Sequence, residues 1–250
     1  RRGAALLAGI DPRLDVYLGE LLVTKCNARS TVHRPNYLDC IALRRRDADG
    51  RVTGLSTYLG LFSSVAYQLP PRLIPVLRRK AGRLAAAIGV TPGGYTDRAL
   101  EHIVDGFPRD TLFQVDHDDL LATTRGVLAL QERQRTRMFL LREPFGRFFT
   151  GLVYLPRERY SREVRAAIQG ILVQAVDAED VEFETQFSES VLARIRFVLR
   201  TRPGTAPALD LADLESRVVE AATSWHDGLR AALFEQVDEV LAARYLHDYG

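Results

Sequence analysis

The spacing of apolar and polar residues between positions 21 and 64 predicts a short buried strand followed by a β-hairpin. The apolar run LLVTK at 21–25 is typical of a buried strand, and two further strand-like runs lie within 30–64. The tetrapeptide Asp-Ala-Asp-Gly at 47–50 separates these runs and ends on a glycine, which a hairpin loop favours at a left-handed final position. The polar cluster at 30–36 leads into this hairpin.

After residue 70 the apolar positions recur at helical spacing, and three helices are predicted. The first begins near Pro75 and ends before Gly89, because proline suits a first helical turn and glycine the position after a helix. A second helix starts near Thr96. Its apolar face consists of Leu100, Ile103, Val104 and Phe107. Asp116 caps a third helix, over 117–133, in which we expect four buried residues: Leu120, Leu121, Val127 and Leu128.

From residue 138 the pattern predicts a second set of strands. Two strand-like runs, Met138 to Leu141 and Arg147 to Leu155, flank a turn-forming sequence and indicate another hairpin. Ser161 caps a helix whose inward positions are Val164, Ala167, Ile168, Ile171 and Leu172. Two more strands follow, Val181 to Phe187 and Val191 to Thr201. The order β-β-α-β-β-α predicts an α+β sandwich with helices on one face of the sheet.

The end of the chain carries one long amphipathic period. Asp210 caps a helix that is periodic through Leu214, Val218, Ala221, Trp225, Leu229, Leu233, Val237 and Leu241. If Gly228 does not break it, this helix reaches roughly 50 to 60 Å at about 1.5 Å per residue. A helix longer than its own sheet usually packs on another domain or subunit, so this segment is predicted to make such contacts.

Composition and charge exclude several classes of partner. The chain is 46% hydrophobic and 26% charged, which is ordinary for a soluble globular protein. Its net charge of +2 provides no broad positive field, so we expect no nucleic-acid partner; an arginine-rich RNA-binding module remains an alternative. No apolar run reaches about 18 residues, so we expect no membrane partner and a cytoplasmic protein. Cys26 and Cys40 are expected to be free, mostly buried thiols.

Candidate chemistry is sparse. No glycine-rich phosphate loop and no metal-ligand spacing of histidine with cysteine is present. The cluster Asp116 to Asp119 could hold a divalent metal in a self-sufficient metal-dependent enzyme, although a helix start favours acidic residues by itself. Five arginines, at 133, 135, 137, 142 and 147, indicate a solvated strand face, with anion binding as the alternative.

Several segments resemble the large bacterial NAD-dependent glutamate dehydrogenases. They include LLVTKCNARSTVHRPNYLDCIAL, YLGLFSSVAYQLPPRLIPVLRRK and TQFSESVLARIRFVLRT, and the matches run in order from about Leu21 to Trp225. The resemblance places the chain in the N-terminal, ACT-like regulatory region of that family, upstream of the catalytic domain. Because the only methionine is Met138, we expect the chain to be a fragment of a longer protein.

The resemblance implies an α+β fold of two ACT-like (ferredoxin-like) α/β sandwich units with antiparallel sheets, joined by helices and followed by a long C-terminal helix. The expected parts are an ACT-like unit with the hairpin and a helix over 1–90, connecting helices over 91–135, a second ACT-like unit over 136–208 and the long helical segment over 209–250. ACT domains commonly bind amino acids or pack together in regulatory assemblies.

The function implied by the resemblance is a non-catalytic regulatory and assembly region of an oxidoreductase of amino-acid catabolism. The parent reaction converts L-glutamate, NAD and water to 2-oxoglutarate, ammonia and NADH, so NAD is the cofactor of the parent and no cofactor is expected in this segment. Expected partners are the other domains and subunits of the same homo-oligomeric dehydrogenase and a small amino-acid effector. Candidate effector or interdomain contacts are His33, Arg34, Asn36, Ser188, Glu189 and Ser190; no catalytic or metal-binding residue is expected.

Overall fold

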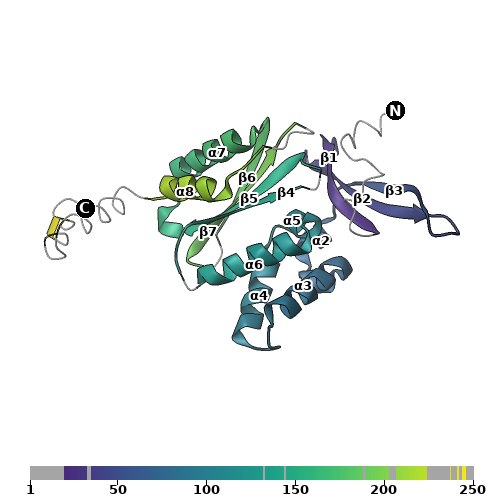
Figure 1. Cartoon of the computed structure of the whole chain (residues 1–250), viewed down its shortest axis with the longest axis horizontal. Helices are drawn as coiled ribbons and strands as arrows, with labels where there is room; N and C mark the ends of the chain where they lie inside the picture. The colour runs from purple at the N-terminus through teal and green to yellow at the C-terminus, as the bar shows by residue number, and fades with distance from the viewer. Residues whose placement is uncertain are drawn as a thin grey trace. The chain divides into compact units, whose positions relative to one another are not determined.

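The computed structural model (Figure 1) contains two compact units. Unit 1 lies within residues 1–133, 141–150 and 200–206, and unit 2 within residues 134–140, 151–199 and 207–250. The structure describes residues 20–32, 35–131, 133–143, 145–187, 190–202 and 207–223, together with 237, 241, 244 and 245.

Unit 1 begins with a three-stranded antiparallel sheet. Its strands are β1 (Leu21–Arg29), β2 (Tyr37–Arg46) and β3 (Val52–Gly60), and they lie side by side in that order. Gly50 closes the β2–β3 turn with a φ of 80°, and the Asp47 carboxylate accepts hydrogen bonds from the backbone N–H groups of Asp49 and Arg51. The predicted hairpin is therefore confirmed, and its turn is held by its own first residue.

Helices follow the sheet in unit 1. They are α2 (Ser64–Gln68), η1 (Pro71–Leu73), α3 (Pro75–Ile88), α4 (Tyr95–Gly106), α5 (Arg109–Gln114) and α6 (His117–Gln131). Pro75 occupies the first turn of α3, and Gly89 ends this helix with a φ of 77°, as the sequence predicts. The four predicted apolar positions on and after α4 are all buried: Leu100, Ile103, Val104 and Phe107.

Helix α6 starts where the sequence predicts, but the residues that it buries differ in part from the predicted ones. Asp116 caps it, because its carboxylate accepts a hydrogen bond from the Asp119 N–H at 2.9 Å. Leu120 and Val127 are buried, whereas Leu121 and Leu128 are only half-buried, so the prediction is wrong for these two. The most buried line also contains Thr123, Thr124 and Leu130, which places Leu121 and Leu128 on its flank.

The later part of the chain contains a four-stranded sheet. Its strands are β4 (Arg137–Arg142), β5 (Phe148–Pro156), β6 (Asp180–Phe187) and β7 (Leu192–Arg200), in the order β4-β5-β7-β6. β5 and β7 run antiparallel, since the Thr201 N–H donates to the Arg147 carbonyl near one end and the Arg157 N–H to the Val191 carbonyl near the other. The predicted α+β class with antiparallel sheets is confirmed.

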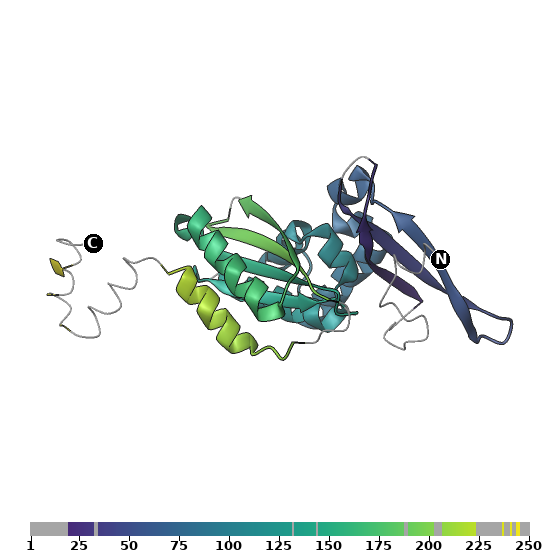
Figure 2. The ribbon, with the colours of Figure 1, turned by 90° about the horizontal axis from the view of Figure 1, so that it is seen from above.

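This strand order explains the unusual sequence of elements. A ferredoxin-like βαββαβ unit has the spatial strand order 4-1-3-2. Reading β5, α7 (Arg162–Val176), β6, β7, α8 (Leu211–Ala221) and finally β4 reproduces that order, with the last strand moved to the front of the chain. Helices α7 and α8 lie side by side on one face of the sheet (Figure 2). These four strands and two helices therefore form a circularly permuted ferredoxin-like sandwich.

The two helices of this sandwich are capped as predicted. The Ser161 hydroxyl accepts a hydrogen bond from the Val164 N–H at the start of α7, and the Asp210 carboxylate accepts bonds from Ala212 and Asp213 at the start of α8. On α7, Ile168 and Leu172 are buried, but Ala167 is exposed, contrary to the prediction, because it lies about 100° around the helix from Ile168.

The long predicted C-terminal helix is documented only over α8. Its later apolar positions Trp225, Leu229 and Leu233 lie outside the described residues. Within the part of the chain that the structure describes, no helix is both long and apolar enough to cross a membrane.

A buried arginine–glutamate network as the candidate functional site

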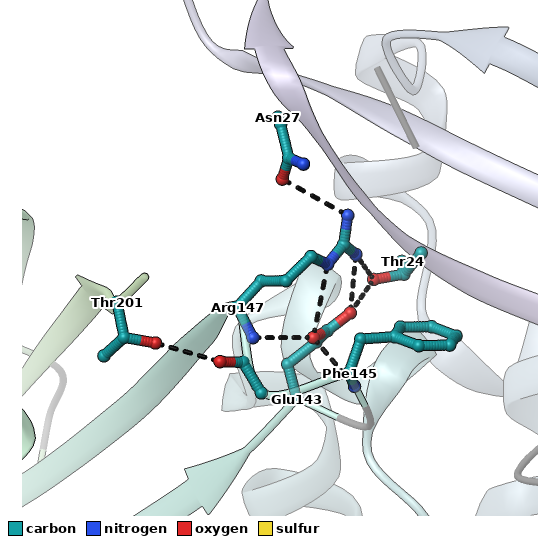
Figure 3. A network of polar contacts seen from close by, with 7 residues as sticks. Thr24, Asn27, Glu143, Phe145, Arg147 and Thr201 are labelled. Carbon is teal, nitrogen blue, oxygen red and sulfur yellow. Dashed lines mark hydrogen bonds and ion pairs between the residues drawn. The ribbon is translucent and has the colours of Figure 1, made fainter. Parts of the chain in front are cut away.

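A buried ion pair in unit 1 joins Arg147 and Glu143 (Figure 3). Arg147 Nη2 lies 2.6 Å from Glu143 Oε1, and Nε lies 3.4 Å from Oε2, so the contact is bidentate. Each side chain is only 1% exposed. Two charges removed from water to this extent are tolerated only when they are paired and hydrogen-bonded.

Strand β1 supplies the remaining partners of this pair. Arg147 Nη2 donates to Thr24 Oγ1 at 2.9 Å, and Arg147 Nη1 donates to Asn27 Oδ1 at 3.3 Å. The Thr24 hydroxyl in turn donates to Glu143 Oε1 at 2.7 Å. Thr24 therefore satisfies both charges, and the network fixes β1 to the turn that contains Glu143 and Arg147 (Figure 3).

The turn itself is organised around the Glu143 carboxylate. Its Oε2 accepts hydrogen bonds from the backbone N–H groups of Phe145 and Arg147. Gly146 adopts a φ of 64°, and a Cβ there would lie 2.7 Å from Arg142 Nη2. The Thr201 hydroxyl donates to the Gly146 carbonyl at 2.9 Å. The local sequence thus forms a rigid turn whose acidic side chain faces inward.

The burial of Arg147 corrects the sequence interpretation. The five arginines between 133 and 147 indicate a solvated strand face, but Arg147 is only 2% exposed. Its partners Thr24 and Asn27 lie about 120 positions earlier in the chain, so the local pattern contains no sign of them. The one local signal is Glu143 four residues before Arg147, a spacing also compatible with a surface pair.

Both lysines of the chain are held by polar contacts, Lys25 by carboxylates and Lys80 by backbone carbonyls. Lys25 Nζ lies 2.5 Å from Asp39 Oδ1 and 3.1 Å from Asp110 Oδ2. Burial raises the pKa of Asp39, and the adjacent Lys25 ammonium opposes this shift. Lys80 Nζ donates to the carbonyls of Leu112, Phe113 and Val115 at the end of α5. Burial lowers the pKa of Lys80 to about 8, opposed by Asp116.

Two thiols lie beside the network. Cys26 and Cys40 are free and buried, as the sequence predicts. Cys40 pairs with Thr24 across the β1–β2 ladder, so the two thiols are diagonal neighbours on one face of the sheet. The hydrogen bond between them lowers the pKa of Cys26 and raises that of Cys40. Cys26 is 0% and Cys40 1% exposed, so both thiols are packed inside unit 1.

Among the described residues, no group of three or more His, Cys, Asp or Glu side chains is arranged to hold a metal ion. The candidate cluster at 116–119 is used at the start of α6, where Asp116 is the cap and Asp118 and Asp119 lie in the first turn. Burial raises the pKa of Asp119, with smaller contributions from Asp116 and Asp118. This arrangement is that of a capped helix start.

The candidate effector or interdomain residues are only partly described. His33, Arg34, Ser188 and Glu189 lie outside the described residues. Asn36 is exposed, and its carbonyl accepts a hydrogen bond from the Ser30 N–H at 2.8 Å. Ser190 is exposed, and its hydroxyl accepts one from the Leu192 N–H. A role in effector binding or in interdomain contact remains a prediction for all six.

Comparison with known proteins supplies the family. Residues 137–226 match the family described as "Glutamate dehydrogenase, ACT2 domain", and residues 74–133 match "Glutamate dehydrogenase, helical motif 1". The chain is similar to the NAD-specific glutamate dehydrogenases of Halomonas elongata (39% identity over 208 residues, 83% of this chain) and Pseudomonas aeruginosa (38% over 220 residues, 88%). The Mycobacterium tuberculosis relative is 28% identical over 236 residues, or 90%. The matched part is 13% to 14% of these relatives.

Proposed function

Because this chain belongs to the family of NAD-specific glutamate dehydrogenases, we propose that it forms a non-catalytic regulatory and assembly region of such an enzyme. The parent oxidises L-glutamate with NAD and water to 2-oxoglutarate, ammonia and NADH in the cytoplasm. NAD binds elsewhere in the parent, and the partners of this region are other domains and subunits of the same enzyme.

The engagement of both lysines is the observation that carries the non-catalytic part of the proposal. Oxidative deamination requires a lysine tuned to activate the water or amine, close to cationic groups for two substrate carboxylates. The sequence contains only Lys25 and Lys80. Lys25 is held by two carboxylates and Lys80 by three backbone carbonyls, so neither amine is free to act on a substrate.

The exposed third strand of unit 1 supports the assembly part. β3 lies at an edge of its sheet, and the β2–β3 hairpin projects beyond the helices of its own unit (Figure 1). Val52, Tyr58 and Leu59 are 45%, 61% and 42% exposed. An edge strand with unpaired backbone groups and exposed apolar side chains is suited to contact with another polypeptide.

The regulatory part of the proposal includes sensing of a small amino-acid effector. The match of residues 137–226 to an ACT2 domain supports a regulatory role, because ACT modules commonly bind amino acids or pair in regulatory assemblies. Within unit 1, the buried Arg147–Glu143 network holds strand β1 against the turn at 143–147.

An assembly experiment on the full-length enzyme tests the proposal. The double substitution Tyr58→Ser and Leu59→Lys on β3 should lower the mass measured by light scattering or change the response to an effector. The kcat of the enzyme should change little. The matched control is Tyr95→Ser, which removes an 83% exposed tyrosine at the start of α4. Unchanged mass and regulation in the β3 variant, with a loss of kcat instead, would contradict an assembly role.

A further inference from the structure

A groove lies between α3 and α4 in unit 1. Its volume is about 210 Å³, and its floor consists of small or aliphatic residues: Pro71, Ala81, Gly82, Ala85, Leu100 and Val104. Drug-sized ligands occupy pockets of about 300 to 1,000 Å³. The groove is therefore too small for a nucleotide and matches a molecule of about the size of one amino acid.

Gly82 keeps the floor of this groove open. It lies in the interior of α3, where glycine destabilises a helix relative to alanine. An added Cβ at Gly82 would meet no atom within 4 Å, so close packing does not require glycine there. Its φ is not in the left-handed region, so the backbone does not require it either. The open space is the structural consequence of glycine at this position.

The charged residues around the groove are unequally satisfied. Asp97 accepts a hydrogen bond from the Gly93 N–H, and Arg72 forms a long ion pair with Asp105 at 4.0 Å. Arg78 on α3 and Glu101 on α4 also line the groove. Both are exposed, and among the residues that the structure describes no hydrogen bond or ion pair engages either side chain. Two arginines and three carboxylates thus line the groove, and Arg78 and Glu101 are the cation and the carboxylate on α3 and α4 that none of these contacts engages.

We propose that this groove binds a zwitterionic α-amino acid with an apolar side chain. Arg78 binds the ligand carboxylate, Glu101 binds its ammonium group, and the side chain lies on the floor above Gly82. The site belongs to the segment that matches the helical motif and is separate from the segment that matches the ACT2 domain. The inference rests on the proposed regulatory function and gives it a specific binding site.

Calorimetry and amide NMR on the purified 250-residue chain provide the first test. L-Leucine is the probe, with 4-methylpentanoate, which lacks the ammonium group, and 3-methylbutylamine, which lacks the carboxylate, as matched controls. L-Leucine should bind saturably below about 10 mM and shift the amide signals of Ala81, Gly82 and Ala85, and each control should bind at least about tenfold more weakly. No saturable binding, or equal binding of either control, would overturn the proposal.

Variants locate the site independently. Gly82→Leu fills the groove and should weaken L-leucine binding by more than about tenfold, whereas Arg78→Gln and Glu101→Gln should each weaken it by about three- to tenfold. The control is Gly170→Leu on α7, where an added Cβ also meets no atom within 4 Å. Circular dichroism confirms folding of each variant. Retained binding in a folded Gly82→Leu variant overturns the proposal.

The outcomes separate this site from the proposed function. If Gly82→Leu changes the mass of the chain or of the full-length enzyme while L-leucine does not bind, the groove is a protein contact, and the amino-acid site is wrong. If L-leucine does not bind but the β3 variant alters assembly, only the present inference fails. If L-leucine binds and the β3 variant leaves assembly unchanged, the assembly role fails and the site stands.

Discussion

Arg147 Nη2 lies 2.6 Å from Glu143 Oε1 inside unit 1, and both side chains are 1% exposed. Arg147→Met would leave the Glu143 carboxylate buried without its charge partner. Breaking such a pair on one side costs about 3 to 5 kcal/mol of the free energy of unfolding. We expect a loss of this size in urea unfolding followed by circular dichroism.

The double variant Arg147→Met with Glu143→Leu should lose less than the single variant, because no uncompensated charge remains. The surface control is Arg137→Met, whose guanidinium lies 2.7 Å from Glu215 but is 35% exposed. That variant should lose less than about 1 kcal/mol. A loss from Arg147→Met no larger than that of the control would show that the network does not stabilise the fold.

The pH dependence of stability should reveal the environment of Lys80. Its pKa is about 8 in the folded chain, below the ordinary value of 10.5. Between these pH values the unfolded chain holds a proton that the folded chain has released, so the free energy of unfolding rises with pH, by about 1 to 3 kcal/mol. Below about pH 8 both states are protonated, and the contribution is constant.

The Lys80→Met variant isolates this effect. Its free energy of unfolding, subtracted from that of the unsubstituted chain at each pH from about 7 to about 11, cancels the titration of all other groups. The difference should increase in favour of the unsubstituted chain above about pH 8. A difference that stays constant or decreases over this range would mean that burial does not lower the pKa of Lys80.

Substitutions at Asp116 distinguish a role as helix cap from a role as metal ligand. Asp116→Ala removes the acceptor for the Asp119 N–H and should lower the free energy of unfolding by about 1 kcal/mol, whereas Asp116→Asn keeps an acceptor and should lose much less. Calorimetric titration with Mg²⁺ and with Mn²⁺ completes the experiment. Saturable metal binding that Asp116→Asn abolishes would favour the metal-dependent enzyme instead.

Local signals in the sequence predict most element boundaries. Pro75 and Gly89 bracket α3, and Ser161 and Asp210 each accept backbone hydrogen bonds at the helix starts that they predict. These residues act on groups within a few positions of themselves, so the sequence alone contains the relevant chemistry. The sequence also predicts the order β-β-α-β-β-α. Its equivalence to a permuted ferredoxin-like fold follows only from the spatial order of the strands.

The candidate site was not predictable in the same way. The Arg147 side chain is hydrogen-bonded to Thr24 and Asn27, which lie about 120 positions earlier in the sequence. The local pattern of apolar and polar residues contains no information about partners so far away. On α6, the apolar pattern offers Leu121 and Leu128 as core residues, yet Thr123 and Thr124 are buried more deeply. Periodicity identifies an amphipathic helix, but tertiary packing selects which side of the stripe lies deepest.

Turnover and NAD binding by the purified 250-residue chain test the central claim most directly, with the full-length enzyme as the positive control. NADH formation from L-glutamate and NAD is followed by absorbance, and NAD binding by calorimetry. The chain alone should form no NADH above background and give no saturable NAD signal, because Lys25 and Lys80 are both held in structural contacts. Measurable NADH formation or saturable NAD binding by the chain alone would contradict a non-catalytic region.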